Sequence, residues 1–295
     1  MVTGIADPVA ALKTVFGNEL TASAVQGVAG GSMSRTGVLE LSDGRKVFIK
    51  QNGASSRGLL SAEAKGLDAL RSAGGPRVPE PYALYEGTRE SYLLMEYIES
   101  GRQGSGFWDR FGSEMAELHR TSRGESYGLS SDNFIGATPQ PNAPSASWIE
   151  FFGGRRLRFQ IELAERNGRA DRDMRTGVEQ IISRLADLLP EPEHPALLHG
   201  DFWGGNFLCD TVGAPVIMDP AVYYGHREAD LAMAECFGGF SPRFFLAYDE
   251  AYPLTPGYRE RVDLYNLYHM LNHLNLFGSG YAGSVRGIIR RYRVT

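Results

Sequence analysis

The strand-like and helix-like segments of this sequence occupy different parts of the chain. Residues 25–50 contain two runs rich in β-branched and aromatic residues, "VLEL" and "KVFIK", and the turn-forming "SDG" between them predicts a hairpin. "VPEPYALYEG" and "SYLLMEYIE" predict two further strands, and after "SGRQGSG" the apolar pattern is mostly helical. We therefore expect an α+β fold with a small β-rich lobe over 1–95, a hinge over 96–106 and a larger, mainly helical lobe over 107–295.

The composition excludes several classes of protein. The 295 residues are enough for two lobes with their own cores, and 42% hydrophobic with 22% charged residues is ordinary for a globular enzyme. A formal charge of −5 gives no basic footprint for nucleic acid, and no apolar run reaches the roughly 20 residues that span a bilayer. Cys209 and Cys236 show no metal-ligand spacing and receive no role. We expect a cytoplasmic monomer that binds neither nucleic acid nor membrane.

Helix signals are clear along the second part of the chain. "FWDRFGSEMAELHR", "VEQIISRLADLLP" and "PGYRERVDLYNLYHMLNHLNLFG" have helical periodicity, and the last two are expected to end at Pro190 and Gly278. The glycine-rich "FGSGYAG" is expected to form a loop.

One predicted helix of the small lobe contains a charge that needs a partner. Leucines of residues 59–71 share one helix face with Glu63. A carboxylate within an apolar stripe is costly unless a cation or hydrogen-bond donors meet it. Lys50, at the end of the strand "KVFIK", is the nearest upstream cation. The pair predicts either a functional contact or a solvated ion pair of little energetic value.

The stretch "LLHGDFWGGNFLCD" places polar residues between two apolar ends. It contains Asp201 and Asn206 in the arrangement D-x-x-x-x-N, and "PVIMDPA" places Asp219 after a short strand-like run. Together with Lys50 and Glu63, their order is that of a protein-kinase-type phosphoryl-transfer site. There Asp201 accepts the substrate proton, Asn206 and Asp219 bind Mg²⁺, and Lys50 held by Glu63 positions the phosphates of ATP. The alternative is a turn in which Asp and Asn satisfy local backbone groups.

Further positions are candidates for nucleotide contacts. Backbone N–H groups of Gly30, Gly31 and Ser32 can approach phosphate oxygens, and the backbone of Glu96 and Ile98 in "MEYIE" can meet an adenine edge. G-x-G-x-x-G and G-x-x-x-x-G-K-[ST] are absent, which disfavours a Rossmann enzyme and a Walker-type NTPase.

Other residues near the motif receive substrate or structural roles. Trp203 is either a core aromatic or a wall against which a sugar or amine packs. His226 and Glu228 either shape the substrate pocket or cap a helix. His199 is expected to hold the catalytic loop, and Asp230 to accept N–H bonds from it. The late-helix residues His269, Asn272 and His273 are expected to pack in the core, with substrate contact as the minority interpretation.

The same residues resemble the fructosamine-3-kinase (ketosamine-3-kinase) family of the protein-kinase-like fold, which is related to aminoglycoside phosphotransferases and choline kinases. The resemblance lies in "LLHGDFWGGNFLCD", "PVIMDPAVYYGHREADLAMAECFGGF", "YGLSSDNFIGATPQPN", "SWIEFFGGRRLRFQIELA" and "YNLYHMLNHLNLFGSGY". It is looser in the first lobe, through "AGGS", "FIK" and "SAEAKGLDAL". The resemblance implies ATP- and Mg²⁺-dependent phosphorylation of the 3-hydroxyl of a small or protein-bound ketosamine, followed by deglycation.

Departures and rivals accompany this interpretation. Some members carry a cysteine in the glycine-rich loop where this chain has Ser32. "HGD" and "DPA" replace H-R-D and D-F-G, and no A-P-E follows, so a phosphorylated activation loop is not expected. One rival acts on another hydroxyl acceptor, such as an aminoglycoside or choline. The other is a non-catalytic nucleotide-binding scaffold. The sequence leaves open which ketosamine is preferred.

Overall fold

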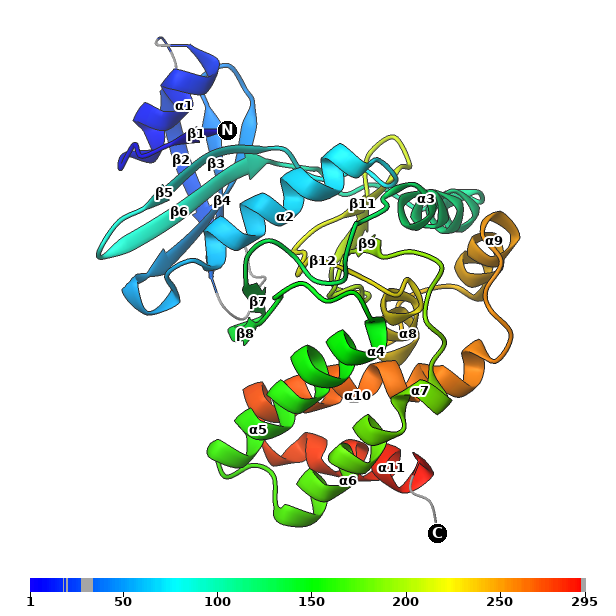
Figure 1. The fold of residues 1–295 in the computed structure, drawn as a ribbon. Coiled ribbons are helices and arrows are strands. Elements are labelled where there is room, and N and C mark those ends of the chain that lie inside the picture. Colours follow the sequence, from blue (N-terminus) through cyan, green and yellow to red (C-terminus); the bar gives the residue numbers. More distant parts are fainter. Residues whose placement is uncertain (18, 20, 28–33, 293–295) are drawn as a thin grey trace.

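The structure is a computed structural model, which describes residues 1–17, 19, 21–27 and 34–292. Two lobes are evident (Figure 1), so the predicted bilobal α+β fold is confirmed. The small lobe is a six-stranded sheet in the order β1-β5-β6-β4-β3-β2. Its elements are β1 (Val2–Thr3), α1 (Pro8–Phe16), β2 (Ala22–Gly27), β3 (Arg35–Leu41), β4 (Lys46–Gly53), α2 (Leu59–Ala73), β5 (Pro81–Glu86) and β6 (Glu90–Glu96), with a 3₁₀ turn, η1, at Ala54–Ser56.

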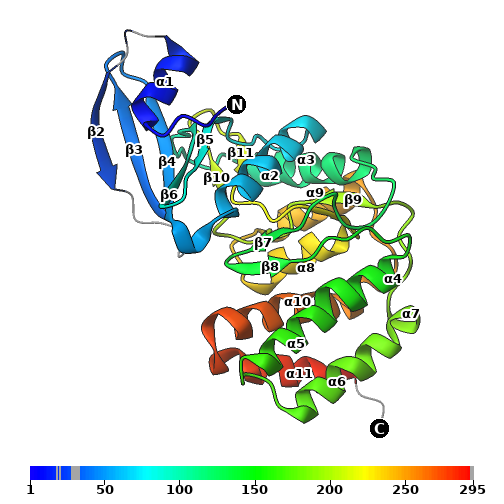
Figure 2. The same ribbon diagram turned by 60° about the vertical axis from the view of Figure 1, so that its left-hand side comes forward.

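The larger lobe is mainly helical (Figure 2). Its helices are α3 (Phe107–Thr121), α4 (Trp148–Phe151), α5 (Phe159–Arg166), α6 (Arg172–Ser183), α7 (Leu185–Leu188), α8 (Glu228–Cys236), α9 (Pro242–Ala251), α10 (Tyr258–Phe277) and α11 (Ala282–Tyr292), with a π-helix η2 (Phe152–Arg158) and a 3₁₀ turn η3 (Ser279–Tyr281). Short antiparallel pairs join β7 (Asn133–Ile135) to β8 (Thr138–Gln140), β9 (Ala196–Leu198) to β12 (Tyr223–Gly225), and β10 (Phe207–Cys209) to β11 (Pro215–Ile217).

Two sequence expectations in the larger lobe need correction. The helix expected to run to Pro190 breaks at Arg184, whose backbone leaves helical geometry and separates α6 from α7. The segment "FGSGYAG" is not simply a loop, because residues 279–281 form a 3₁₀ turn and α11 starts at Ala282. The end of α10 next to Gly278 agrees with the prediction, since this glycine adopts φ +89°, a left-handed conformation that other residues rarely take.

Helix α2 belongs to a hydrophobic core that both lobes share. Its Leu60, Leu67 and Leu70 are buried in the same cluster as Phe111 and Met115 of α3. A separate cluster fills the outer part of the small lobe, between α1 and the sheet. Among the described residues, no helix has the length and apolar character needed to cross a membrane. The shared core places the inner face of α2, and with it Glu63, at the junction of the lobes.

Candidate active site

Lys50 connects the two lobes through two ion pairs. Its Nζ lies 2.7 Å from Oε1 of Glu63 on α2 and 2.6 Å from Oδ1 of Asp219 in the larger lobe. Burial opposes the charge of the ammonium group, but the two carboxylates outweigh it and raise the pKa of Lys50. Burial raises the pKa of Glu63 to about 6, against the attraction of Lys50. The carboxylate on the apolar helix face therefore has the cationic partner that its position requires.

Asp201 and Asn206 lie on one tight loop between β9 and β10. The Asn206 amide nitrogen donates to the Asp201 backbone oxygen at 2.8 Å and to Oδ2 of its carboxylate at 2.9 Å. Burial raises the pKa of Asp201 to about 7, opposed by the bond from Asn206 and reinforced by the charge of Asp219. A carboxyl with such a pKa can exchange a proton near neutral pH, which suits a general base.

A buried carboxylate holds this loop from below. Oδ2 of Asp230 on α8 accepts from the His199 backbone N–H at 2.7 Å, and Oδ1 accepts from Gly200 at 2.9 Å, as the sequence predicts. His199 is fully buried, with Nε2 2.9 Å from the Met218 carbonyl oxygen. Burial lowers the pKa of His199, so its ring is neutral and supports the loop through the contact with Met218. Gly200 has φ +80°, and an added Cβ would lie 2.0 Å from the Ala221 oxygen.

The β10–β11 hairpin carries the two predicted metal ligands at its open end. Asn206 directly precedes β10, and Asp219 follows β11 with φ +56°, which makes it the one residue other than glycine with positive φ in the described ranges. The Met218 backbone N–H donates to the Asn206 carbonyl at 2.9 Å and holds the two ends together. Such a strained backbone persists only where its surroundings fix it, and strain of this kind is common at functional sites.

The closed end of this hairpin is tied to the hinge. Arg77, in the connection between α2 and β5, donates from Nη1 to Oδ2 of buried Asp210 at 2.6 Å, and its Nη2 contacts Glu96 at the end of β6. Its main chain also pairs with the hairpin, because the Ile217 N–H donates to the Arg77 oxygen at 2.9 Å. Arg77 therefore links the hinge, the small lobe and the metal-ligand hairpin.

A cleft of about 740 Å³ opens between the lobes over these residues. Its lining includes all five residues of the predicted constellation, Lys50, Glu63, Asp201, Asn206 and Asp219. It also includes the hinge residues Glu96 and Ile98, together with apolar Phe48, Met95 and Leu208 from both lobes. Gly30, Gly31 and Ser32 lie outside the residues that the structure describes.

The far end of the cleft is aromatic. Trp203 is 39% exposed and lies edge-on to Phe237, with ring centroids 6.4 Å apart, so the core interpretation of this tryptophan is wrong. Phe237 in turn packs on His273 of α10 at 4.8 Å. Phe277 and Tyr281 complete this wall. His273 lines the cleft, as the minority interpretation of the sequence has it, whereas Phe237, Phe277 and Tyr281 were not predicted because α10 meets the motif only through tertiary packing.

His226 and Glu228 do not line the cleft, which corrects their assignment to the substrate pocket. Both are buried beneath it, and Nδ1 of His226 lies 2.5 Å from the hydroxyl of Tyr265. Glu228 accepts two bonds from Arg261 of α10, at 2.7 and 2.6 Å. The charged and polar side chains of "GHRE" thus face inward, where Tyr265 and Arg261 of α10 satisfy His226 and Glu228 and so anchor α8 to α10.

The oxygen donors at the cleft fit a hard cation. Because the amide nitrogen of Asn206 is bonded to Asp201, its oxygen is the atom that can meet a metal ion, and the carboxylate of Asp219 is 41% exposed towards the cleft. Within residues 1–17, 19, 21–27 and 34–292, no group of three or more His, Cys, Asp or Glu side chains could hold a metal. Two oxygen ligands supplemented by phosphate oxygens and water are the usual protein contribution to a Mg²⁺ site.

Comparison with known proteins identifies the family. The family model described as fructosamine kinase matches residues 5–294. The chain belongs to the fructosamine kinase family. An Arabidopsis thaliana chloroplastic protein-ribulosamine 3-kinase is 43% identical over 256 residues, which cover 85% of this chain and 77% of that protein. Mouse ketosamine-3-kinase is 34% identical over 308 residues, covering 95% and 99%.

Solved structures agree with this family assignment. A crystal structure from Thermobifida fusca has a TM-score of 0.86 at 33% identity and covers 97% of this chain and 98% of its own. A choline kinase from Streptococcus pneumoniae has a TM-score of 0.63 at 15% identity, covering 95% and 98% of the two chains, and shares the fold alone. The kinase-like fold predicted from the order of motifs is therefore confirmed, and so is the predicted family.

Proposed function

We propose that this protein transfers the γ-phosphate of ATP to the 3-hydroxyl of a ketosamine, a sugar joined to an amine beside a C2 carbonyl. The supporting observation is that Asp201, Asn206 and Asp219 converge at one cleft with the Lys50–Glu63 pair. Two relatives, a ketosamine-3-kinase and a protein-ribulosamine 3-kinase, favour a ketosamine acceptor.

Each side chain has one task in the transfer. Lys50, held by Glu63, exchanges its contact with Asp219 for nucleotide phosphate oxygens, and hinge backbone at Glu96 and Ile98 meets the adenine. Asp201 takes the acceptor proton while the acceptor oxygen bonds to the γ-phosphorus and the bond to ADP breaks. Asn206 and Asp219 would hold Mg²⁺ together with phosphate oxygens, and the ion would supply positive charge that offsets the phosphate charge. The aromatic wall with Trp203 supports the sugar and its amine.

The product explains how such a transfer leads to deglycation. A phosphate on C3 is a leaving group next to the C2 carbonyl. Enolisation removes a proton from C1 and gives a C1=C2 enaminol. The nitrogen lone pair then forms a C1=N bond, the C1=C2 electron pair becomes a C2=C3 bond, and the C3–O bond to phosphate breaks. Water hydrolyses the resulting imine, which releases the amine and leaves a dicarbonyl sugar fragment. Repair of glycated amines is the biological role that this chemistry supports, in the cytoplasm.

A substrate panel tests the proposal. Purified protein with ATP and Mg²⁺ is offered a ribulosamine, a fructosamine, aminoglycosides and choline, and ADP release is measured. We expect turnover with ketosamines, and Asp201→Ala should lose transfer while ATP binding, followed by calorimetry, remains. Turnover restricted to aminoglycosides or choline would replace the acceptor assignment. ATP binding without turnover of any acceptor would favour a scaffold.

A further inference from the structure

A second hollow, of about 800 Å³, lies on the larger lobe between α8, α9 and the start of α10. We call it the α8–α9 groove. Its apolar surface includes Phe245, Leu246 and Leu254, and Leu246 is 56% exposed. An apolar patch rimmed by polar residues is typical of an interaction site. Charged side chains also line it: Glu235, Asp249, Glu260 and Arg259. Arg259 pairs with Glu235 at 2.6 Å, so the charges of Asp249 and Glu260 remain and leave the groove acidic.

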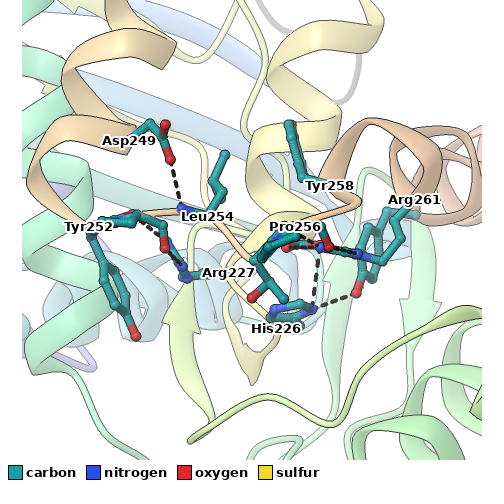
Figure 3. Close-up of polar contacts among 12 residues, drawn as sticks. His226, Arg227, Asp249, Tyr252, Leu254, Pro256, Tyr258 and Arg261 are labelled. Atoms are coloured by element: carbon teal, nitrogen blue, oxygen red, sulfur yellow. Dashed lines mark hydrogen bonds and ion pairs between the residues drawn. The ribbon is translucent and has the colours of Figure 1, made fainter.

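The wall of the groove is fixed by buried arginines, as Figure 3 shows. Arg227 donates to the Tyr252 carbonyl at 2.8 Å, and Arg261 donates to the Thr255 and Pro256 carbonyls, each at 2.9 Å. Asp249 accepts from the Leu254 N–H at 2.7 Å. Four bonds therefore hold the connection between α9 and α10 in one shape. A preformed wall lowers the entropic cost of docking a partner.

The groove and the catalytic cleft share a wall. Phe237 lines the cleft, while the next residue, Gly238, lines the groove. A Cβ added to Gly204 of the catalytic loop would lie 2.8 Å from the Gly238 oxygen and 3.0 Å from the Gly239 Cα, so this wall packs directly on the loop beside Trp203. A substrate polypeptide that extends from the aromatic end of the cleft across Phe237 therefore meets the groove at the next residue of this protein, Gly238.

From these contacts we infer that the α8–α9 groove binds the polypeptide that flanks a glycated lysine, and that it selects a flank containing an apolar and a basic residue. The inference rests on the proposed function, since it adds a binding site for the polypeptide around the same ketosamine acceptor. Charge complementarity identifies the occupant: the acidic groove repels an acidic flank and attracts a basic one. Leu246 offers the apolar contact.

The test compares acceptors that present the same ketosamine. These are free ribulosyl-lysine, a peptide with ribulosyl-lysine flanked by Leu and Arg, and a peptide with the same lysine flanked by Glu. We expect kcat/KM for the basic peptide to exceed that for the acidic peptide by about 5-fold or more at low salt, and the ratio to shrink at high salt. Leu246→Glu and Glu260→Lys should each lower kcat/KM for the basic peptide by about 3- to 10-fold. In both variants, kcat/KM for free ribulosyl-lysine should equal that of the wild type.

Val212→Glu is the matched control, because Val212 is 82% exposed on the turn of the β10–β11 hairpin and away from the groove. This variant should not alter the ratio between the peptides. Equal use of both peptides by the wild type, or equal losses on free and peptide acceptors in the groove variants, would overturn the inference while leaving the proposed function intact. Absence of turnover with all three acceptors would overturn the proposed function itself.

Discussion

Asp201, the proposed base, is a carboxyl group whose charged form is disfavoured by burial in the folded protein. Burial raises its pKa from the usual 3.8 to about 7. Below pH 4 the carboxyl is protonated in both folded and unfolded states and costs nothing. Between pH 4 and pH 7 the unfolded chain releases its proton first, so folding stability falls as the pH rises through this window. The charge needed for catalysis therefore opposes folding.

The substitution Asp201→Asn keeps the oxygen that accepts from Asn206 and removes the charge. We expect it to abolish transfer and to raise the free energy of unfolding at pH 8 by about 1–3 kcal/mol. Each 1 kcal/mol should raise the melting temperature by about 2–4 °C. At pH 4 the two proteins should melt together. Thermal unfolding at both pH values measures the difference. A variant that is no more stable than wild type at pH 8 would show that burial does not disfavour the charged form of Asp201.

The same pKa should control the acid limb of activity. The base must be ionised, so kcat/KM for the acceptor should fall about tenfold per pH unit below pH 7. Glu63, whose pKa burial raises to about 6, is the other group that titrates nearby. Glu63→Gln should lower kcat/KM, but kcat/KM should still begin to fall near pH 7, as in the wild type. Rate profiles from pH 5 to pH 9 make the comparison, and loss of the limb in Glu63→Gln would assign it to Glu63 instead.

At the scale of elements, Arg77 links Glu96 at the hinge to Asp210 of the β10–β11 hairpin, which carries the proposed metal ligands. Its side chain is 41% exposed, so the ion pairs themselves contribute little to stability. Its removal, however, takes a charged donor from the buried carboxylate of Asp210 and frees the hairpin to shift. We expect Arg77→Met to raise the KM for ATP by about 5- to 30-fold, equivalent to about 1–2 kcal/mol, and to leave the KM for the acceptor unchanged.

Arg243 supplies the matched control for this element. It is similarly exposed, at 42%, and likewise pairs with two carboxylates, but these belong to Asp109 and Glu250, which lie outside the hinge and the β10–β11 hairpin. Arg243→Met should leave the KM for ATP unchanged. Steady-state kinetics of the two variants decide the matter, and equal kinetics would reduce Arg77 to a surface ion pair.

How far the sequence predicts the site depends on whether the signal is local. The Lys50–Glu63 contact follows from one helix face, because a carboxylate among leucines needs a cation. The support of the catalytic loop by Asp230 could likewise be anticipated. The direction in which His226 and Glu228 point could not be anticipated. The motif gives their spacing, but the packing of α8 against α10 decides which side chains face inward. The aromatic wall of Phe237 and His273 depends on tertiary contacts that no local pattern encodes.

At the scale of the whole molecule, the hydrophobic clusters do not follow the boundary drawn between the lobes in the sequence. The inner face of α2 is continuous with the core of α3, whereas the outer cluster between α1, β3 and β4 is separate. Buried apolar contact sets which segments open together. Helix α2, with Glu63, should therefore remain with the larger lobe when the outer sheet opens.

Hydrogen exchange under native conditions can detect this division. We expect amides of α1 and β3 to exchange through an opening of lower free energy than those of α2, α3 and α10, because the outer cluster is the smaller one. In the proposed site, ATP with Mg²⁺ would contact both parts, so at 100 times its Kd it should raise the free energy of the outer opening by up to about 2.7 kcal/mol. The substitution Asp219→Asn, which weakens the metal site and the bridge to Lys50, should remove most of the Mg²⁺-dependent part of this protection. If α2 instead exchanged together with α1 and β3, the shared core would not be what holds Glu63 in place, and the pairing of Lys50 with Asp219 would have to carry the connection between the lobes alone.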